Sequence, residues 1–335
     1  MPSGPPLAPA LDRDSALPAA ETGAGIVGLG VAVPERVMPN AEVESRLGVD
    51  DGWIASRTGV RERRVAAAEE TLTALASSAG ARALERAAVD AGQLDLVLVA
   101  TVTPDDLMPN AAPLVAARLG ASRAGAIDVG AACAGFVSGL ALASAQVEAG
   151  RASSVLVVGA DLMSRVVDAD DRSTAGLFGD GAGAAVVGAA GTGQIGPILL
   201  GSDGAGAEQI FASHAERKIR MDGRPTFRAA VARLSEVTLE VAAGAGIALS
   251  EIDLFVYHQA NRRILGAVGE RLGLPSERVV DCIERYGNTS AASVPIALSD
   301  AAGSGRLRPG MTVFLGAFGA GFVWAGALVR WGGQR

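Results

Sequence analysis

The stretch "DVGAACAGFVSGLALASAQVEAG", from Asp128 to Gly150, sets one cysteine among alanines and glycines, directly before a long apolar segment. The residues after Cys133 are apolar on nearly every side of a helix, which is typical of a helix buried inside a protein. A cysteine at the start of such a helix lies at the positive end of the helix dipole, which favours its thiolate. We therefore predict that Cys133 is a catalytic nucleophile, although free cysteines are also among the residues most often buried for packing alone.

Alternating strands and helices are predicted on both sides of this stretch. Residues 94–100, 153–160, 252–258 and 311–318 are short, continuous apolar runs. Such runs suit strands that are covered on both faces, as in parallel sheets between helix layers. In residues 72–87, apolar side chains recur at helical spacing. The pattern indicates an α/β fold.

The chain also resembles itself. Residues 89–99 resemble 247–257, "RLG" at 118–120 returns at 271–273, and 154–160 resemble 311–317, at offsets of 153 to 158 residues. Landmarks in the same order at a nearly constant offset predict two similar halves packed face to face. The turn at Cys133 then corresponds to "GNTSAAS" around Asn288, and a pseudo-two-fold axis would bring the two turns together.

We place the halves at residues 23–192 and 193–335, with the nucleophile in the first half and the histidine and asparagine discussed below in the second. The preceding residues 1–22 are rich in Pro and Ala and lack a basic start followed by an apolar core. This composition predicts a disordered tail and not a signal peptide.

Composition excludes several classes of protein. Lys and Arg number 29 against 36 Asp and Glu, so the net charge of −7 argues against general nucleic-acid binding. Two cysteines fit a reducing compartment, and no Cys or His spacing predicts a metal site. No apolar run approaches the roughly 20 residues that a membrane-spanning helix needs. We expect a soluble, cytoplasmic protein without a metal.

Further candidate residues lie in the second half. His258 ends an apolar run at the carboxyl end of a predicted strand, where sites of α/β proteins collect, although a lone histidine is more often structural. Asn288 is either a turn residue or an amide donor to a carbonyl. Glycines in "GAFGAGFVWAG" (316–326) let backbone N–H groups approach a substrate oxygen. We expect His214 to be solvated and Cys282 to be structural.

Together these motifs resemble the β-ketoacyl-acyl-carrier-protein synthase III family, condensing enzymes with the thiolase fold. The matching motifs are "WIASRTGVRERR" (53–64), "TVTPDDLMPN" (101–110), "AACAGF" (131–136), "LFGDGAGAAVV" (177–187), "HQAN" (258–261) with Arg263, "GNTSAAS" (287–293) and "FGAGFVW" (318–324). The resemblance extends over nearly the whole chain from about Gly25. It implies two pseudo-symmetric halves stacked as a five-layer αβαβα sandwich.

The resemblance implies a catalytic triad of Cys133, His258 and Asn288. An acyl-CoA primer would acylate Cys133, with the backbone N–H groups of Cys133 and Ala320 as the oxyanion hole. Malonyl-acyl carrier protein would then lose carbon dioxide while His258 and Asn288 hydrogen-bond its thioester oxygen. The resulting carbanion equivalent would attack the acyl-cysteine and give β-ketoacyl-carrier protein. No permanently bound cofactor is implied.

The resemblance also assigns binding residues. It places the adenine of coenzyme A between Trp53 and Arg172, since indole and guanidinium faces suit a stacked purine. Further residues implied in substrate binding are Arg57 near the phosphates, Gly223 and Asn261 along the pantetheine arm, and Met108, Leu162 and Phe178 at the acyl pocket. Met108 would reach into the pocket of the partner subunit in a homodimer.

The sequence departs from the family at three places. Gly52 stands where an acidic residue is usual, Ala320 replaces a common glycine, and residues 206–227 form a shortened segment beside the expected pantetheine tunnel.

Two alternatives remain open: a specialised secondary-metabolite acyltransferase that does not condense, and a catalytically silent partner subunit. The intact triad counts against a silent subunit. A redox protein or a cysteine protease fits poorly, and no glutamate ahead of Cys133 suits a hydroxymethylglutaryl-CoA synthase.

Overall fold

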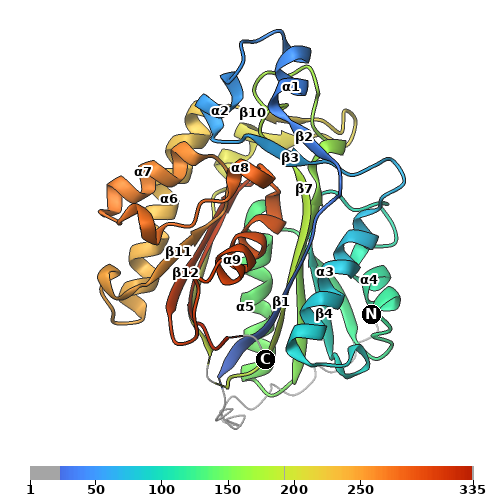
Figure 1. Ribbon diagram of the computed structural model, residues 1–335. Coiled ribbons are helices and arrows are strands. Elements are labelled where there is room, and N and C mark those ends of the chain that lie inside the picture. The colour runs from blue at the N-terminus through green and yellow to red at the C-terminus, as the bar shows by residue number, and fades with distance from the viewer. Residues whose placement is uncertain (1–22, 192, 334–335) are drawn as a thin grey trace, which may run out of the picture.

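A computed structural model describes residues 23–191 and 193–333 of the chain. The predicted disordered tail, residues 1–22, lies outside the described residues. Two β-sheets face each other across a pair of helices, and further helices cover the outer face of each sheet (Figure 1). No helix within the described ranges has the length and apolarity needed to cross a membrane.

The first sheet has five strands, and its central strands carry the predicted apolar runs. Their order is β1 (Ala24–Ala32), β7 (Asp180–Ala189), β6 (Ser154–Leu162), β4 (Leu96–Ala100) and β5 (Gly125–Val129). Strand β4 runs parallel to β5 and β6, whereas β7 is antiparallel to β6 and β1. All residues of β6 are buried, as expected for a strand covered on both faces.

The second sheet repeats most of this arrangement. Its order is β11 (Leu254–Tyr257), β12 (Thr312–Gly319), β13 (Val323–Arg330) and β8 (Gln194–Ser202). Strand β11 is parallel to β12, and the other pairs are antiparallel. Val279 forms a parallel bridge with Phe255 of β11, as β5 pairs with β4 in the first sheet.

Helices complete the layers. Helices α5 (Gly135–Glu148) and α9 (Ser293–Gly303) lie between the sheets. The outer layers are α3 (Leu72–Ala87) with α4 (Ala111–Leu119) on the first sheet, and α6 (Gly223–Gly244) with α7 (Arg262–Leu272) on the second (Figure 1). Helix α3 occupies the range predicted from its spacing, and the Thr71 side chain caps it by accepting a hydrogen bond from Ala74 N–H. The predicted five-layer sandwich is confirmed.

Short elements cap one end of the sandwich, at the top of Figure 1. They are the pair β2 (Val37–Pro39) and β3 (Glu62–Arg64), the pair β9 (Ile210–Ala212) and β10 (Ile219–Met221), and helices α1 (Asn40–Leu47), α2 (Trp53–Thr58) and α8 (Ile283–Tyr286). The shortened segment noted in the sequence forms β9, β10 and the start of α6.

The predicted duplication is visible in the element positions. Strands β11 and β12 and helix α9 each begin 158 residues after β4, β6 and α5. A single 3₁₀ turn precedes each central helix, at Ala132–Ala134 and at Ser290–Ala292. The first residue of each turn is left-handed, with φ of 42° at Ala132 and 49° at Ser290. The first residues of the two turns therefore share one backbone conformation. The division of the chain into halves at residues 23–192 and 193–335 stays a prediction.

One expectation for the central helix is wrong in part. The apolar pattern of helix α5 predicted a helix buried inside the protein, but Leu142 is 46% exposed. Ile127, on the edge strand β5 of the first sheet, is also 56% exposed.

Candidate active site

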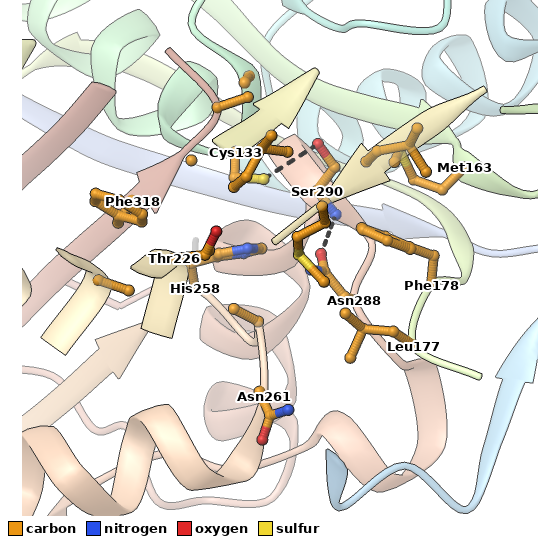
Figure 2. A pocket seen from close by; sticks show the side chains of 18 of the residues that line it. Cys133, Met163, Leu177, Phe178, Thr226, His258, Asn261, Asn288, Ser290 and Phe318 are labelled. Atoms are coloured by element: carbon orange, nitrogen blue, oxygen red, sulfur yellow. Dashed lines mark hydrogen bonds between the residues drawn. The ribbon is translucent and has the colours of Figure 1, made fainter. Parts of the chain in front are cut away.

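A cavity of about 340 Å³ brings the three predicted catalytic residues together (Figure 2). Cys133 comes from the turn before α5, His258 follows β11, and Asn288 precedes the turn before α9. Phe178 and Ala320 line the same cavity. Two halves of a duplicated chain thus contribute to one site, because the central helices begin side by side.

The end of β12 passes directly against the nucleophile. A Cβ atom on Gly319 would lie 2.9 Å from both the Cβ and the backbone nitrogen of Cys133, so only glycine fits there. The next residue, Ala320, lines the cavity. The backbone of residues 319–320 is therefore close to the thiol, where we predicted the second donor of the oxyanion hole.

Burial opposes ionisation of the Cys133 thiol. Burial and the negative charge of Asp161 raise the pKa, hydrogen bonds from Ser290 and the backbone lower it, and together they place it at about 12. The sequence indicates a thiolate favoured by the helix terminus. Burial and the helix terminus act in opposite directions here, so the thiolate stays a prediction.

His258 is neutral and poised to hydrogen-bond. The side chain is 2% exposed, and burial lowers its pKa to about 3. Its backbone N–H donates to Gly316 O at 2.7 Å, which fixes the residue at the end of β11. The buried Nδ1 atom has no hydrogen-bond partner within the described residues. A neutral imidazole offers one donor and one acceptor, so it can bind a substrate oxygen without carrying charge.

Asn288 is oriented by its neighbours. Its backbone N–H donates to Leu177 O at 2.9 Å, and its carbonyl accepts from Gly179 N–H at 3.0 Å. Its side-chain Oδ1 accepts from Ser290 N–H at 2.9 Å. Because the amide oxygen is already used, the NH₂ group is the part left to donate to a substrate oxygen. This fits the role predicted for the asparagine.

The residues predicted for coenzyme A gather at one corner, beside the cavity. Asn261 lines the cavity and donates to Arg57 O at 3.2 Å, which ties the start of α7 to α2. The Arg57 guanidinium lies 4.3 Å from the centre of the Trp53 ring. Arg172 instead donates to Leu47 O at 3.1 Å. Arg57, which was predicted to lie near the phosphates, thus lies over the indole, and the adenine site between Trp53 and Arg172 stays a prediction. Gly223 lines the cavity at the start of α6.

The three residues predicted for the acyl pocket lie in different surroundings. Leu162 is 1% exposed and packs in the core beneath α3, and it does not line the cavity. Its neighbour Met163 lines the cavity instead, because adjacent residues near a strand end point in different directions. Met108 is 85% exposed and does not line the cavity of its own chain. Phe178 does.

Several residues of the site were missed by the sequence analysis. Ser290 contacts the nucleophile, with its Oγ 3.6 Å from Cys133 Sγ. Asp161, at the end of β6, is completely buried. Thr226 lines the cavity with a buried hydroxyl that has no partner in the described chain. A carboxylate directly after an apolar strand was the available signal for Asp161.

The remaining reactive side chains lie outside the site. Cys282 is 1% exposed and packs in the central core, and burial raises the pKa of its thiol. His214 is exposed on the loop between β9 and β10. Across the ranges that the structure describes, no group of three or more His, Cys, Asp or Glu residues is arranged to hold a metal ion.

A cysteine, a buried neutral histidine and an oriented amide, presented by two matching turns of a duplicated α/β fold, define an acyl-transferring enzyme of the thiolase fold. Family models agree: residues 127–204 match 3-oxoacyl-[acyl-carrier-protein] synthase III, and residues 242–331 match the C-terminal part of that family. The chain belongs to the β-ketoacyl-acyl-carrier-protein synthase III family, whose members are condensing acyltransferases.

Similar proteins cover almost the whole chain. β-Ketoacyl-[acyl-carrier-protein] synthase III 2 of Streptomyces coelicolor is 47% identical over 96% of this chain and 98% of its own length. The synthase III structure from Thermus thermophilus is 47% identical, with a TM-score of 0.89, over 92% of this chain and 99% of that one. The priming β-ketosynthase of the R1128 polyketide pathway is 39% identical, with a TM-score of 0.88, over 93% and 97% of the two chains.

Proposed function

We propose that this protein condenses an acyl group from acyl-CoA with malonyl-acyl carrier protein, releasing coenzyme A, carbon dioxide and β-ketoacyl-carrier protein. The convergence of Cys133, His258 and Asn288 on one cavity carries this proposal. Membership in the synthase III family supports the same reaction. We further propose that the enzyme works in the cytoplasm, holds no permanently bound cofactor and uses the two thioesters only as substrates.

In the first half-reaction, Cys133 attacks the carbonyl of the acyl-CoA thioester. The tetrahedral oxyanion is held by the backbone N–H groups of Cys133 and Ala320, whose chain segments are in contact at Gly319. Fixed donors of this kind stabilise the negative charge as it develops and typically contribute about 100- to 1000-fold in rate per donor. The acyl chain extends past Phe178 and Met163, which line the apolar part of the cavity.

In the second half-reaction, His258 and Asn288 stabilise an enolate. Loss of carbon dioxide from the malonyl thioester places negative charge on the thioester oxygen. The neutral imidazole and the free NH₂ group of the asparagine donate to this oxygen, so no metal is required for the step. The enolate carbon then attacks the acyl-cysteine. Burial keeps His258 uncharged over the physiological pH range, which suits a donor that is not itself consumed.

Coenzyme A is proposed to bind at the corner formed by α1, α2 and the start of α7. Trp53 offers an aromatic face, and the exposed Arg57 and Arg172 offer charges for phosphates. Since Arg57 lies over the indole, adenine must either displace this guanidinium or use the other ring face. The pantetheine arm would pass Asn261 and Gly223 into the cavity.

A homodimer through the β5 edge is also proposed. This strand pairs with β4 on one side only, and its other edge has no partner among the described strands; unpaired strand edges with apolar side chains favour association. Four apolar side chains on or near this edge are substantially exposed: Leu107, Met108, Ile127 and Leu142. A two-fold partner would cover them and let Met108 reach the acyl pocket of the other subunit.

The proposed reaction fits two metabolic pathways. One structural relative is a priming ketosynthase of a polyketide pathway, so a polyketide starter role stands beside initiation of fatty-acid synthesis. The two roles share one reaction and differ in the primer and the carrier protein. A non-condensing acyltransferase with the same residues is the remaining alternative.

The test combines intact mass with product analysis. The protein is incubated with a panel of acyl-CoAs, beside Cys133→Ala and, as a matched control, Cys282→Ala. Malonyl-carrier protein is then added, and carbon dioxide and β-ketoacyl product are measured. Acylation that vanishes only in Cys133→Ala, followed by product, supports the proposal. Acylation without product favours the acyltransferase, and an absence of acylation by every acyl-CoA contradicts the coenzyme A site.

A further inference from the structure

One buried glutamine connects the segments that carry His258 and Asn288. Gln259 directly follows His258 at the end of β11 and is 1% exposed. Asn288 lies on a separate segment, between helices α8 and α9. In the proposed reaction both side chains donate to one substrate oxygen, so the distance between their segments has to be fixed.

The side-chain amide of Gln259 holds the start of the segment that carries Asn288. Its Nε2 donates to Val280 O at 3.0 Å, and its Oε1 accepts from Cys282 N–H at 2.9 Å. The second Nε2 proton goes to Tyr257 O at 2.8 Å, on β11 itself. Both protons of the NH₂ group are thus used, and the pattern of partners distinguishes the nitrogen of the amide from its oxygen. Cys282 directly precedes helix α8, which leads to Asn288.

The backbone of Gln259 holds the other end of the same segment. Its N–H donates to Ser293 Oγ at 2.6 Å, and Ser293 is the first residue of α9. Both residues are 1% exposed, and away from water a hydrogen bond is electrostatically stronger. Residues 280–293 are therefore tied at both ends to the residue beside His258, with Asn288 between the two ties.

The other contacts of the two catalytic residues attach them to different parts of the fold. The backbone of Asn288 bonds Leu177 O at 2.9 Å and Gly179 N–H at 3.0 Å, both in the first half. The backbone N–H of His258 bonds strand β12, and its buried Nδ1 has no partner within the described residues. These bonds place each residue separately. Gln259 is the residue that joins the two segments to each other.

We propose that Gln259 is a positioning residue that sets the distance between His258 and Asn288, so that both donate to the same enolate oxygen. This inference rests on the proposed two-step condensation and adds a residue outside the triad. Gln259 does not line the cavity and acts through the two residues that do. Acylation of Cys133 uses other donors, the backbone N–H groups of Cys133 and Ala320. Gln259 therefore serves the condensation and not the acylation.

The first variant that tests this role is Gln259→Met, which keeps the length of the side chain and removes its hydrogen bonds. The ties to Val280 and Cys282 are lost, so the segment that carries Asn288 can move relative to His258. A misplacement of about 1 Å at a site can slow a catalytic step about 100-fold. We expect a loss of this size in the condensation step, with the KM for malonyl-carrier protein and the rate of acylation little changed.

The second variant is Ser293→Ala, which removes the acceptor of Gln259 N–H and leaves the glutamine side chain in place. Alanine is the best helix former, so this variant keeps the test open where Gln259→Met does not fold. We expect a smaller loss in the same step. Ser235→Ala is the matched control, because that buried hydroxyl donates to Val231 O of its own helix and does not line the cavity.

The two half-reactions are measured separately. Acylation is followed by rapid mixing with acyl-CoA and intact mass. The acylated protein is then isolated and mixed with malonyl-carrier protein, and β-ketoacyl product and carbon dioxide are measured in a single turnover. Slower condensation with little change in acylation supports the proposal. Equal slowing of both half-reactions overturns it. So does unchanged condensation in folded Gln259→Met, or in Ser293→Ala where Gln259→Met does not fold.

The imidazole signals of His258 give a second readout that needs no turnover. The chain has two histidines, so the variant His214→Gln identifies the signals of His258 in nitrogen-15 spectra. Changed His258 signals in Gln259→Met and Ser293→Ala, but not in Ser235→Ala, support the positioning role, and unchanged signals in the first two overturn it. If the unaltered protein reacts with no acyl-CoA, the proposed function fails, while these spectra still decide the role of Gln259.

Discussion

The reactivity of Cys133 decides between two physical effects that oppose each other at this position. The helix terminus favours the thiolate, whereas burial favours the thiol and raises the pKa from its ordinary value of 9.0 to about 12. Three pH units correspond to about a thousandfold less thiolate at neutral pH, or about 4 kcal/mol. We expect the rate of alkylation by iodoacetamide to rise about tenfold per pH unit from pH 6 to pH 10.5 without a plateau.

The assay is alkylation followed by intact mass and peptide mapping across this pH range. Cys133→Ala gives the contribution of Cys282, which is buried and is expected to react little. The slope against pH is the decisive quantity, because restricted access changes the absolute rate but not the titration. A plateau near pH 8 or below would show that the helix terminus outweighs burial. The prediction that burial outweighs the helix terminus at Cys133 would then be wrong.

Three further predictions concern stability and assembly. Because the pKa of His258 is lowered to about 3, the unfolded chain binds a proton below about pH 6.5 that the folded chain does not. The free energy of unfolding, measured by urea titration, should therefore fall by up to about 1.4 kcal/mol per pH unit between pH 6.5 and 3. The fall should be less steep in His258→Gln. In Gly159→Ala, the new Cβ would lie 2.2 Å from a carbonyl oxygen of the turn before α9. We expect thermal unfolding to show a loss of about 1–3 kcal/mol of stability, together with slower acylation of Cys133. Gly188→Ala is the control and should change little, because the nearest contact of its new Cβ is 3.4 Å. Ile127→Asp should convert the proposed dimer to monomers in sedimentation, and an unchanged dimer would exclude the β5 edge.

The fold could be predicted from the sequence because its signals are local and repeated. Continuous apolar runs identified the central strands, and helical spacing identified α3 to the residue. The duplication followed from landmarks at a constant offset, which the paired positions of β4 and β11 confirm. The same offset aligned the turns at Cys133 and Asn288. These features depend on residues close together in the chain, or on the order of such groups.

What the sequence could not provide depends on side-chain direction and solvation. Leu162 and Met163 are adjacent and both apolar, and only the structure shows which of them faces the cavity. The position of Arg57 over the indole of Trp53 is a rotamer choice that no motif encodes. The balance between burial and helix dipole at Cys133 depends on how much water the fold removes. Asp161 was missed because its partners come from two distant segments, residues 101–103 and 290–291.

The two matching turns present different side chains to one site. Both begin with a left-handed residue that places the next residues at the start of a central helix. In the first turn this residue is Ala132, and the following residue is the nucleophile Cys133. In the second turn it is Ser290, whose hydroxyl contacts that cysteine across the pseudo-two-fold axis. The counterpart of Cys133 in the second turn is Ala291, so the two copies differ at two successive positions. A structural repeat therefore supplies the nucleophile from one copy and the hydroxyl beside it from the other.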